Sequence, residues 1–159
     1  MAITHNPGKL FCVNYERTFS PNSERYLSFN VSVLTAADFP RHQDKPLVDV
    51  AVEAILDKKG RDIRILDMRH LDHRVADFFI ICTGKTDVQT VAIADDVLRK
   101  GRELVDERPT HKEGYQRGEW ILLDYGDVVI HIFQPRVREF YNLEDFWGDA
   151  YITEVESPD

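Results

Sequence analysis

The chain has 159 residues, of which 43% are hydrophobic and 30% are charged, and its formal net charge is −8. These values indicate a soluble globular domain with one core and exclude disordered and fibrous proteins. A chain this acidic is repelled by phosphate backbones, which argues against direct binding of DNA or other nucleic acid and favours a basic protein partner or a neutral ligand. No apolar run is long enough to cross a membrane and no signal sequence is visible, so we expect a cytoplasmic protein.

Residues 1–45 differ from the rest of the chain in charge and in pattern. Their charges sum to +1, whereas those of the remaining 114 residues sum to −9. Residues 27–33 alternate apolar and polar side chains, as a half-buried strand does, and residues 10–15 are a second candidate strand. We therefore predict an N-terminal extension, either a β-hairpin or a partly ordered segment, joined to the main domain by a linker at 35–46.

The main domain is predicted over residues 46–150. Its first element is a helix that begins at Pro46, a residue favoured in first helical turns, and stops at Gly60. Strands follow at 61–68 and 78–83. The second of them is an uninterrupted apolar run, which is typical of a central strand covered on both faces.

A long amphipathic helix is predicted over residues 86–107, opening with Thr-Asp-Val-Gln, the spacing of a capping box. A polar loop leads from it to a hairpin at 118–133, and short helical turns over 138–150 precede an acidic tail at 151–159. This order of elements indicates an α/β fold, a two-layer sandwich in which a mixed sheet carries helices mainly on one face.

The hairpin is expected to turn at Tyr125 and Gly126, because glycine supplies the positive φ of a tight turn. Asp124 then lies opposite Asp127. Two carboxylates in this position resemble an acid/base pair, but aspartates that flank a turn commonly accept hydrogen bonds from its amides. We therefore predict a turn role for the two aspartates and not a catalytic one.

The same register gives the hairpin two apolar faces, with Trp120 opposite His131 and Leu122 opposite Val129. One face is purely aliphatic and suits packing beneath the long helices: Ile121, Leu123, Val128, Ile130 and Ile132. The other face also carries aromatic rings: Trp120, Leu122, Val129, His131 and Phe133. When helices cover only one side of a sheet, the other side is exposed to water and should carry mainly polar side chains. The aromatic face is therefore either covered by the N-terminal strands, the 140–147 segment or a second copy, or it is a docking surface.

Several segments resemble the ribosomal silencing factor family, also called Iojap-like proteins. They are DIRILDM, VADFFIICTGKTDVQTVAIADDV, the Glu-Gly pair at 113 and 114, and EWILLDYGDVVIHIFQPRVREFYNLEDFWGDA. The resemblance runs from Leu47 to Ala150 and does not cover residues 1–45. It departs at Asp72 and His73, where the family more often has a hydroxyl residue, and at Phe78, where tyrosine is common.

The resemblance implies a nucleotidyltransferase-like topology without the active site, no enzyme activity and no cofactor. Family members bind the large ribosomal subunit through its fourteenth protein, at the face where the small subunit docks. They block subunit joining and repress translation when nutrients are scarce. The tryptophan that opens the WILLD-type strand is implicated in this contact, and its match here is Trp120.

Applied to this chain, the resemblance predicts an aromatic anchor at Trp120 and an acidic rim that meets basic side chains. The predicted partner-binding residues are Trp120, Leu122, Val129, His131, Phe133, Glu113, Glu119 and Asp124. A homodimer closed through the same face is an alternative, and the two states are compatible.

Two other functions, nucleotidyltransferase activity and metal binding, have weaker support in the sequence. A nucleotidyltransferase needs a glycine turn that holds triphosphate and strand carboxylates that hold Mg²⁺. Thr83-Gly84-Lys85 resembles only the first, because Asp95 and Asp96 lie within the predicted long helix. A metal site at His70, Asp72 and His73, with His131 as a further ligand, would need these side chains to converge, and we expect no metal there.

Overall fold

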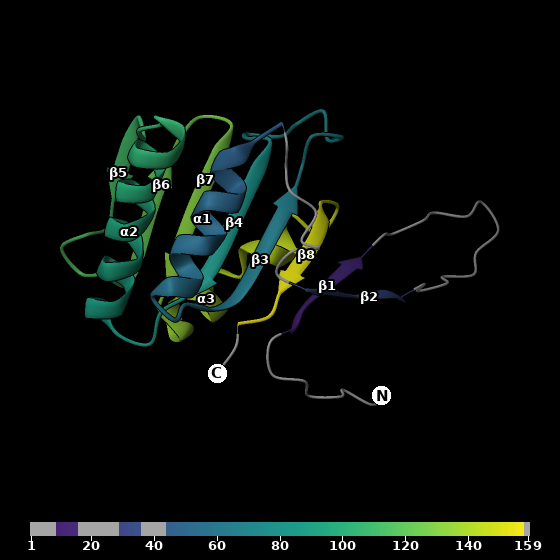
Figure 1. Cartoon of the computed structure of the whole chain (residues 1–159), viewed down its shortest axis with the longest axis horizontal. Helices are drawn as coiled ribbons and strands as arrows, with labels where there is room; N and C mark the ends of the chain where they lie inside the picture. The colour runs from purple at the N-terminus through teal and green to yellow at the C-terminus, as the bar shows by residue number, and fades with distance from the viewer. Residues whose placement is uncertain (1–8, 16–28, 36–43, 158–159) are drawn as a thin grey trace.

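In the computed structural model, residues 44–157 and the backbone of residues 9–15 and 29–35 are described. Within these ranges eight strands form one sheet, in the order β2-β1-β8-β3-β4-β7-β6-β5 (Figure 1). The strands are β1 Lys9–Tyr15, β2 Phe29–Thr35, β3 Arg61–Asp67, β4 Phe78–Thr83, β5 His111–Glu113, β6 Trp120–Asp124, β7 Val128–Phe133 and β8 Tyr151–Val155. The helices are α1 Pro46–Asp57, α2 Asp87–Val105, α3 Pro135–Tyr141 and α4 Leu143–Phe146. β4 and β7 pair in parallel and the other described pairs are antiparallel, so the predicted mixed α/β fold is confirmed.

The sheet separates two apolar cores, because successive side chains of a strand point to opposite faces. Figure 1 shows α1 and α2 side by side over one face, and the aliphatic face of the hairpin packs beneath them as predicted. The other face carries a second core, built from Leu66, Phe79, Ile81 and Phe133 together with Trp147 at the end of α4. Long helices therefore cover one face and two short helices with the 68–77 loop cover part of the other.

The β6–β7 hairpin forms, but its predicted register is wrong by two residues. Trp120 pairs with Phe133 and Leu122 pairs with His131. The two-residue loop is Gly126 and Asp127, since the Tyr125 N–H donates to the Val128 carbonyl at 2.9 Å. Gly126 has a φ of 86° at the first loop position, which is the pattern of a type II′ turn. A shift of two residues preserves the parity of each strand, so the two predicted faces keep their members.

The two hairpin aspartates have different roles in the turn. Asp124 Oδ1 accepts a hydrogen bond from the Gly126 N–H at 2.7 Å, which is the predicted turn role. Asp127 instead forms an ion pair with Lys45. The corrected register places Asp124 opposite Val129, so the two carboxylates do not face each other across the ladder.

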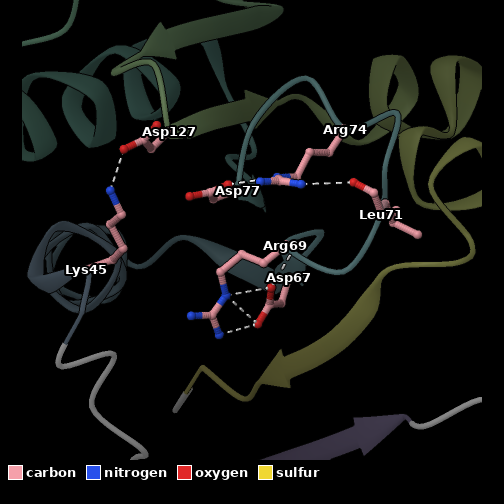
Figure 2. A network of polar contacts seen from close by, with 7 residues as sticks. All are labelled: Lys45, Asp67, Arg69, Leu71, Arg74, Asp77 and Asp127. Carbon is pink, nitrogen blue, oxygen red and sulfur yellow. Dashed lines mark hydrogen bonds and ion pairs between the residues drawn. The ribbon is translucent and has the colours of Figure 1, made fainter.

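Backbone hydrogen bonds hold the loop between β3 and β4 against the hairpin turn. Figure 2 shows the side-chain contacts around them, including those of Arg74 with Asp77 and Leu71 and of Lys45 with Asp127. The Asp127 carbonyl accepts hydrogen bonds from the Asp77 and Phe78 N–H groups, at 2.8 and 3.0 Å. Arg74 donates to Asp77 Oδ1 at 2.9 Å and to the Leu71 carbonyl at 3.1 Å. These bonds connect the hairpin turn, the β3–β4 loop and the start of β4 at one end of the strands.

The predicted acidic tail at 151–159 is wrong for residues 151–155, which form β8. This strand pairs antiparallel with β3, with Ile152 opposite Leu66 and Val155 opposite Ile63. Val155 packs into the core under the long helices and Ile152 against the other core, so the segment alternates as a strand must. The segment is short and is followed by acidic residues, so this alternation was not recognised in the sequence.

The N-terminal extension contributes two strands to the sheet. β1 pairs antiparallel with β2 and also with β8, so these strands extend the sheet beyond β8. Figure 1 places them at the opposite end of the sheet from β5 and β6. The alternative in which the N-terminal strands cover the aromatic face of the hairpin is therefore wrong. Residues 16–28, between the two strands, and most of the predicted linker at 35–46 lie outside the described residues.

In the part of the chain that the structure describes, no helix has the length and apolar character that a membrane span requires.

Asp106 ends α2 in the left-handed region, with a φ of 54°, where glycine is favoured. We expect Asp106→Gly to raise the free energy of unfolding by about 0.5–1 kcal/mol, because the strain of the side chain exceeds the added entropy of the unfolded chain. Asp106→Ala should lower it, since alanine keeps a Cβ and loses the aspartate's tolerance of this region. Urea denaturation of the two variants and the unaltered protein measures these free energies. A higher free energy of unfolding for Asp106→Ala than for Asp106→Gly would contradict the prediction.

Candidate functional site

A groove with a volume of about 1000 Å³ lies between the start of β6 and helix α3. Residues 112–120, which run from β5 through a loop into β6, form one wall. Residues 136–141 of α3 form the other. The groove therefore opens where the aromatic face of the hairpin is not covered by the rest of the chain.

Trp120 is half-buried in this groove and is held by three neighbours. Its ring stacks on Phe133 with the centroids 5.0 Å apart, and Tyr141 contacts it with a centroid distance of 4.7 Å. The indole Nε1–H donates a hydrogen bond to His131 Nδ1 at 3.2 Å. The indole is thus oriented before any partner arrives.

His131 supports Trp120 from within the domain. Its side chain is only 4% exposed, and burial lowers its pKa from an ordinary value of 6.5 to about 4. Because Nδ1 accepts the indole hydrogen bond, the proton of the neutral ring belongs on Nε2. That nitrogen has no hydrogen-bond partner among the described residues. His131 is therefore an uncharged acceptor beneath the tryptophan.

Helix α3 supplies a wall of the groove that the hairpin pattern did not predict. Phe140 is 80% exposed and Tyr141 is 50% exposed, and both line the groove. Pro135 occupies the first turn of α3, two residues after β7 ends, so the helix begins directly after the strand. The aromatic pair in REFYN was a signal in the sequence, although it was considered there only as a possible cover for the hairpin.

Charges around the groove are balanced. Its lining has three basic side chains and three acidic ones: Lys112, Arg117, Arg136, Glu113, Glu119 and Glu139. Arg117 and Glu119 approach within 3.9 Å of each other and are both exposed, so their attraction is weak. The net charge of −8 is therefore not concentrated at this site.

Gly114 lets the wall of the groove pass close to Trp120. Its φ is +88°, and a Cβ at this position would lie 1.8 Å from the Trp120 carbonyl oxygen. Any side chain here would displace the loop from the start of β6. The Glu-Gly pair at 113 and 114 is thus a requirement of the groove's shape.

Arg138 fastens the other wall to the sheet. Its Nε and Nη2 donate to Glu144 Oε1, at 2.9 and 2.6 Å. Its Nη1 donates to the Asp62 carbonyl at 2.6 Å and to Thr83 Oγ1 at 2.7 Å. Both charged side chains are about nine-tenths buried, so α3 is connected to α4 and to the strands β3 and β4.

Comparison with known proteins places this chain in a family. Residues 40–159 match the family described as ribosomal silencing factor during starvation. The chain belongs to the ribosomal silencing factor family. It is 40% identical over 113 residues to ribosomal silencing factor RsfS of Halalkalibacterium halodurans, a match that covers 71% of this chain and 95% of the relative. It is also 40% identical over 100 residues to the chloroplastic protein Iojap of Zea mays, covering 63% of this chain and 42% of that protein.

The fold agrees with this membership. A crystal structure of a Chromobacterium violaceum protein superimposes with a TM-score of 0.62 at 38% identity, covering 65% of this chain and 85% of that one. The similarity of sequence and of fold confirms the predicted family and the α/β architecture.

The groove of this silencing factor contains only part of the predicted partner-binding set. Trp120 lies in it, and Glu113 and Glu119 are exposed on its rim. Leu122 is half-buried and packs against the second core, outside the groove lining. Asp124 lies at the far end of β6 and is engaged in the turn. The structure therefore does not bring Leu122 or Asp124 to the same site.

Three predicted contact residues are buried. Val129 is 8% exposed, His131 4% and Phe133 0%. The expectation that they form an exposed docking face is wrong, because Val129 and Phe133 belong to the second core and the His131 ring lies beside Phe79 of the neighbouring strand. His131 and Phe133 support Trp120 from below, whereas Val129 lies opposite Asp124 at the other end of the hairpin.

The residues considered for enzyme chemistry and for metal binding are dispersed in the silencing factor fold. Thr83 Oγ1 accepts a hydrogen bond from Arg138, and the buried Asp96 accepts from Arg99 within α2. His70 Nε2 lies 2.9 Å from the Asp149 carbonyl, and the His73 ring stacks on Trp147. Among the described residues, no group of three or more His, Cys, Asp or Glu side chains could hold a metal ion.

Proposed function

We propose that this silencing factor binds the large ribosomal subunit through its fourteenth protein and uses the Trp120 groove for the contact. The observation that carries the proposal is a half-buried tryptophan, pre-oriented by Phe133, Tyr141 and His131, at an open groove. Large aromatic side chains in such positions contribute most of the energy of many protein interfaces. Family membership supports the ribosome as the partner.

The mechanism that we propose is steric. A domain that occupies the face where the small subunit docks prevents the two subunits from joining, and translation falls when nutrients are scarce. Occlusion depends on affinity and position, and it needs no bond to form or break. The proposal therefore assigns no catalytic residue and no cofactor to this chain.

Glu113 and Glu119 are the rim acids that remain in this proposal, since both are exposed beside the groove. Charges at a rim influence mainly the association rate and its dependence on salt. We therefore assign them a minor share of the affinity and Trp120 the major one.

Replacing Trp120 with alanine tests the proposal. We expect binding to purified large subunits to weaken by roughly 30-fold, equivalent to about 2 kcal/mol, because the anchor ring is lost. Co-sedimentation of the protein with large subunits over a concentration series measures this change. Trp120→Phe should bind with intermediate affinity, since it keeps an aromatic ring over Phe133 but is smaller than the indole and has no N–H donor for His131.

The folded fraction of each variant must be measured in the same buffer, because Trp120 also contacts the second core. Full binding by a folded Trp120→Ala protein would refute the assignment of the groove.

A further inference from the structure

Phe140 is the most exposed of the large apolar side chains in the described part of the chain, at 80%. Its ring meets that of Tyr141 edge-on, with centroids 5.1 Å apart, and Tyr141 contacts Trp120 at 4.7 Å. The three rings thus form a continuous row from the tip of α3 to the base of the groove. An exposed aromatic ring beside a half-buried one is typical of a binding surface.

The row is fixed in place before binding. Arg138 joins α3 to Glu144, to the Asp62 carbonyl and to Thr83, so the wall that carries Phe140 cannot rotate away without breaking these bonds. On the opposite wall Gly114 packs directly against the Trp120 backbone. A ligand therefore meets two prearranged aromatic surfaces, which lowers the entropy cost of binding.

The balanced charges of the lining restrict the ligand further. Three acidic and three basic side chains surround the aromatic row, so neither a strongly basic nor a strongly acidic segment is favoured at its centre. The complementary ligand is a protein segment with an apolar side chain at its centre and no large net charge.

We propose that Phe140 is a second anchor for the ribosomal partner, which packs an apolar side chain against the row formed by Phe140, Tyr141 and Trp120. This inference rests on the proposed function and specifies how its site recognises the partner. Recognition at the groove depends on apolar contact, and the acidity of the rest of the domain contributes little there.

Phe146 provides a matched control. It is 76% exposed and lies on α4, and its ring meets that of Trp147 edge-on at 5.1 Å and 80°, compared with 5.1 Å and 85° for Phe140 and Tyr141. The two phenylalanines therefore have nearly the same surroundings. They differ in that Phe140 lines the groove and Phe146 does not.

The experiment compares Phe140→Ala with Phe146→Ala in full-length protein, using purified large ribosomal subunits in co-sedimentation. We expect Phe140→Ala to weaken binding by roughly tenfold, as loss of an interface aromatic does, and Phe146→Ala by less than about twofold. Both variants should unfold at the same urea concentration as the unaltered protein, because both rings are exposed. The loss caused by Phe140→Ala should be the same at low and at high salt.

Trp120→Ala is included so that the two proposals can fail separately. If Trp120→Ala weakens binding and Phe140→Ala does not, the second anchor is refuted and the proposed function stands. If neither weakens binding, both are refuted. A loss with Phe146→Ala equal to that with Phe140→Ala would refute an anchor specific to the groove. A loss with Phe140→Ala that disappears at high salt would refute an apolar ligand.

Discussion

Replacing Arg138 with methionine is expected to lower the free energy of unfolding by about 3–5 kcal/mol, the cost of breaking a buried ion pair by removing one partner. The guanidinium makes four hydrogen bonds, to Glu144, the Asp62 carbonyl and Thr83. Without it, the ion pair that the buried Glu144 carboxylate keeps among the described residues is with Arg64, whose Nη1 is 3.7 Å away. A carboxylate left nearly unpaired in this position destabilises the folded state.

Arg136→Met is the matched control, because Arg136 lies two positions earlier on the same helix and is exposed. It should change the free energy of unfolding by no more than about 0.5 kcal/mol. Combining Arg138→Met with Glu144→Gln should restore part of the loss, since the buried charge is then removed as well. Urea denaturation followed by circular dichroism measures all four proteins. A loss below about 1 kcal/mol for Arg138→Met would show that the network acts only as a surface ion pair does.

Acid should destabilise the protein through His131 between pH 6.5 and about pH 4. The pKa of this histidine is lowered from 6.5 to about 4 in the folded state because its ring is buried. Between these values the unfolded chain binds the proton and the folded chain does not, so stability falls as the pH falls. Above pH 6.5 the ring is neutral in both states and its contribution is complete. The total loss is about 3 kcal/mol, from a shift of roughly 2.5 pH units at 1.36 kcal/mol each.

His131→Asn isolates this effect, because the asparagine oxygen can accept the Trp120 hydrogen bond and the side chain does not titrate. The two proteins should differ in their pH dependence by about 3 kcal/mol between pH 6.5 and 4, whatever their difference at neutral pH. Urea denaturation at a series of pH values supplies the comparison. Parallel curves for the two proteins would show that His131 titrates normally in the folded state.

Much of the central domain was predictable because its signals are local. The continuous apolar run at 78–83 became β4, buried on both faces, and the periodic stretch before Gly60 became α1. The faces of the hairpin were predicted correctly although its register was not, since parity depends only on which residues alternate. The turn was placed one residue early because glycine occupies the first loop position here and not the second.

The missed elements have weak local signals. β5 is three polar, exposed residues, and it is a strand only because β6 lies beside it. β8 has only five residues, and their alternation is too brief to be distinguished from a tail. Lys100 illustrates the same limit in a helix, because its burial depends on Glu53 and Asp57, more than forty positions earlier on α1.

The candidate site, too, was predictable from the sequence only in part. Trp120 and its aromatic neighbours on the hairpin were evident from the alternation of β6 and β7, and the family was evident from the motifs that contain them. Which of these side chains remain accessible depends on α3 and α4, whose positions follow from bonds between Arg138 and residues 55 and 76 positions away. Periodicity along a chain determines which face a side chain takes, because it reflects local backbone geometry. Whether that face is buried or open is a property of distant segments brought together by folding, so the groove and its second wall emerged only from the three-dimensional structure.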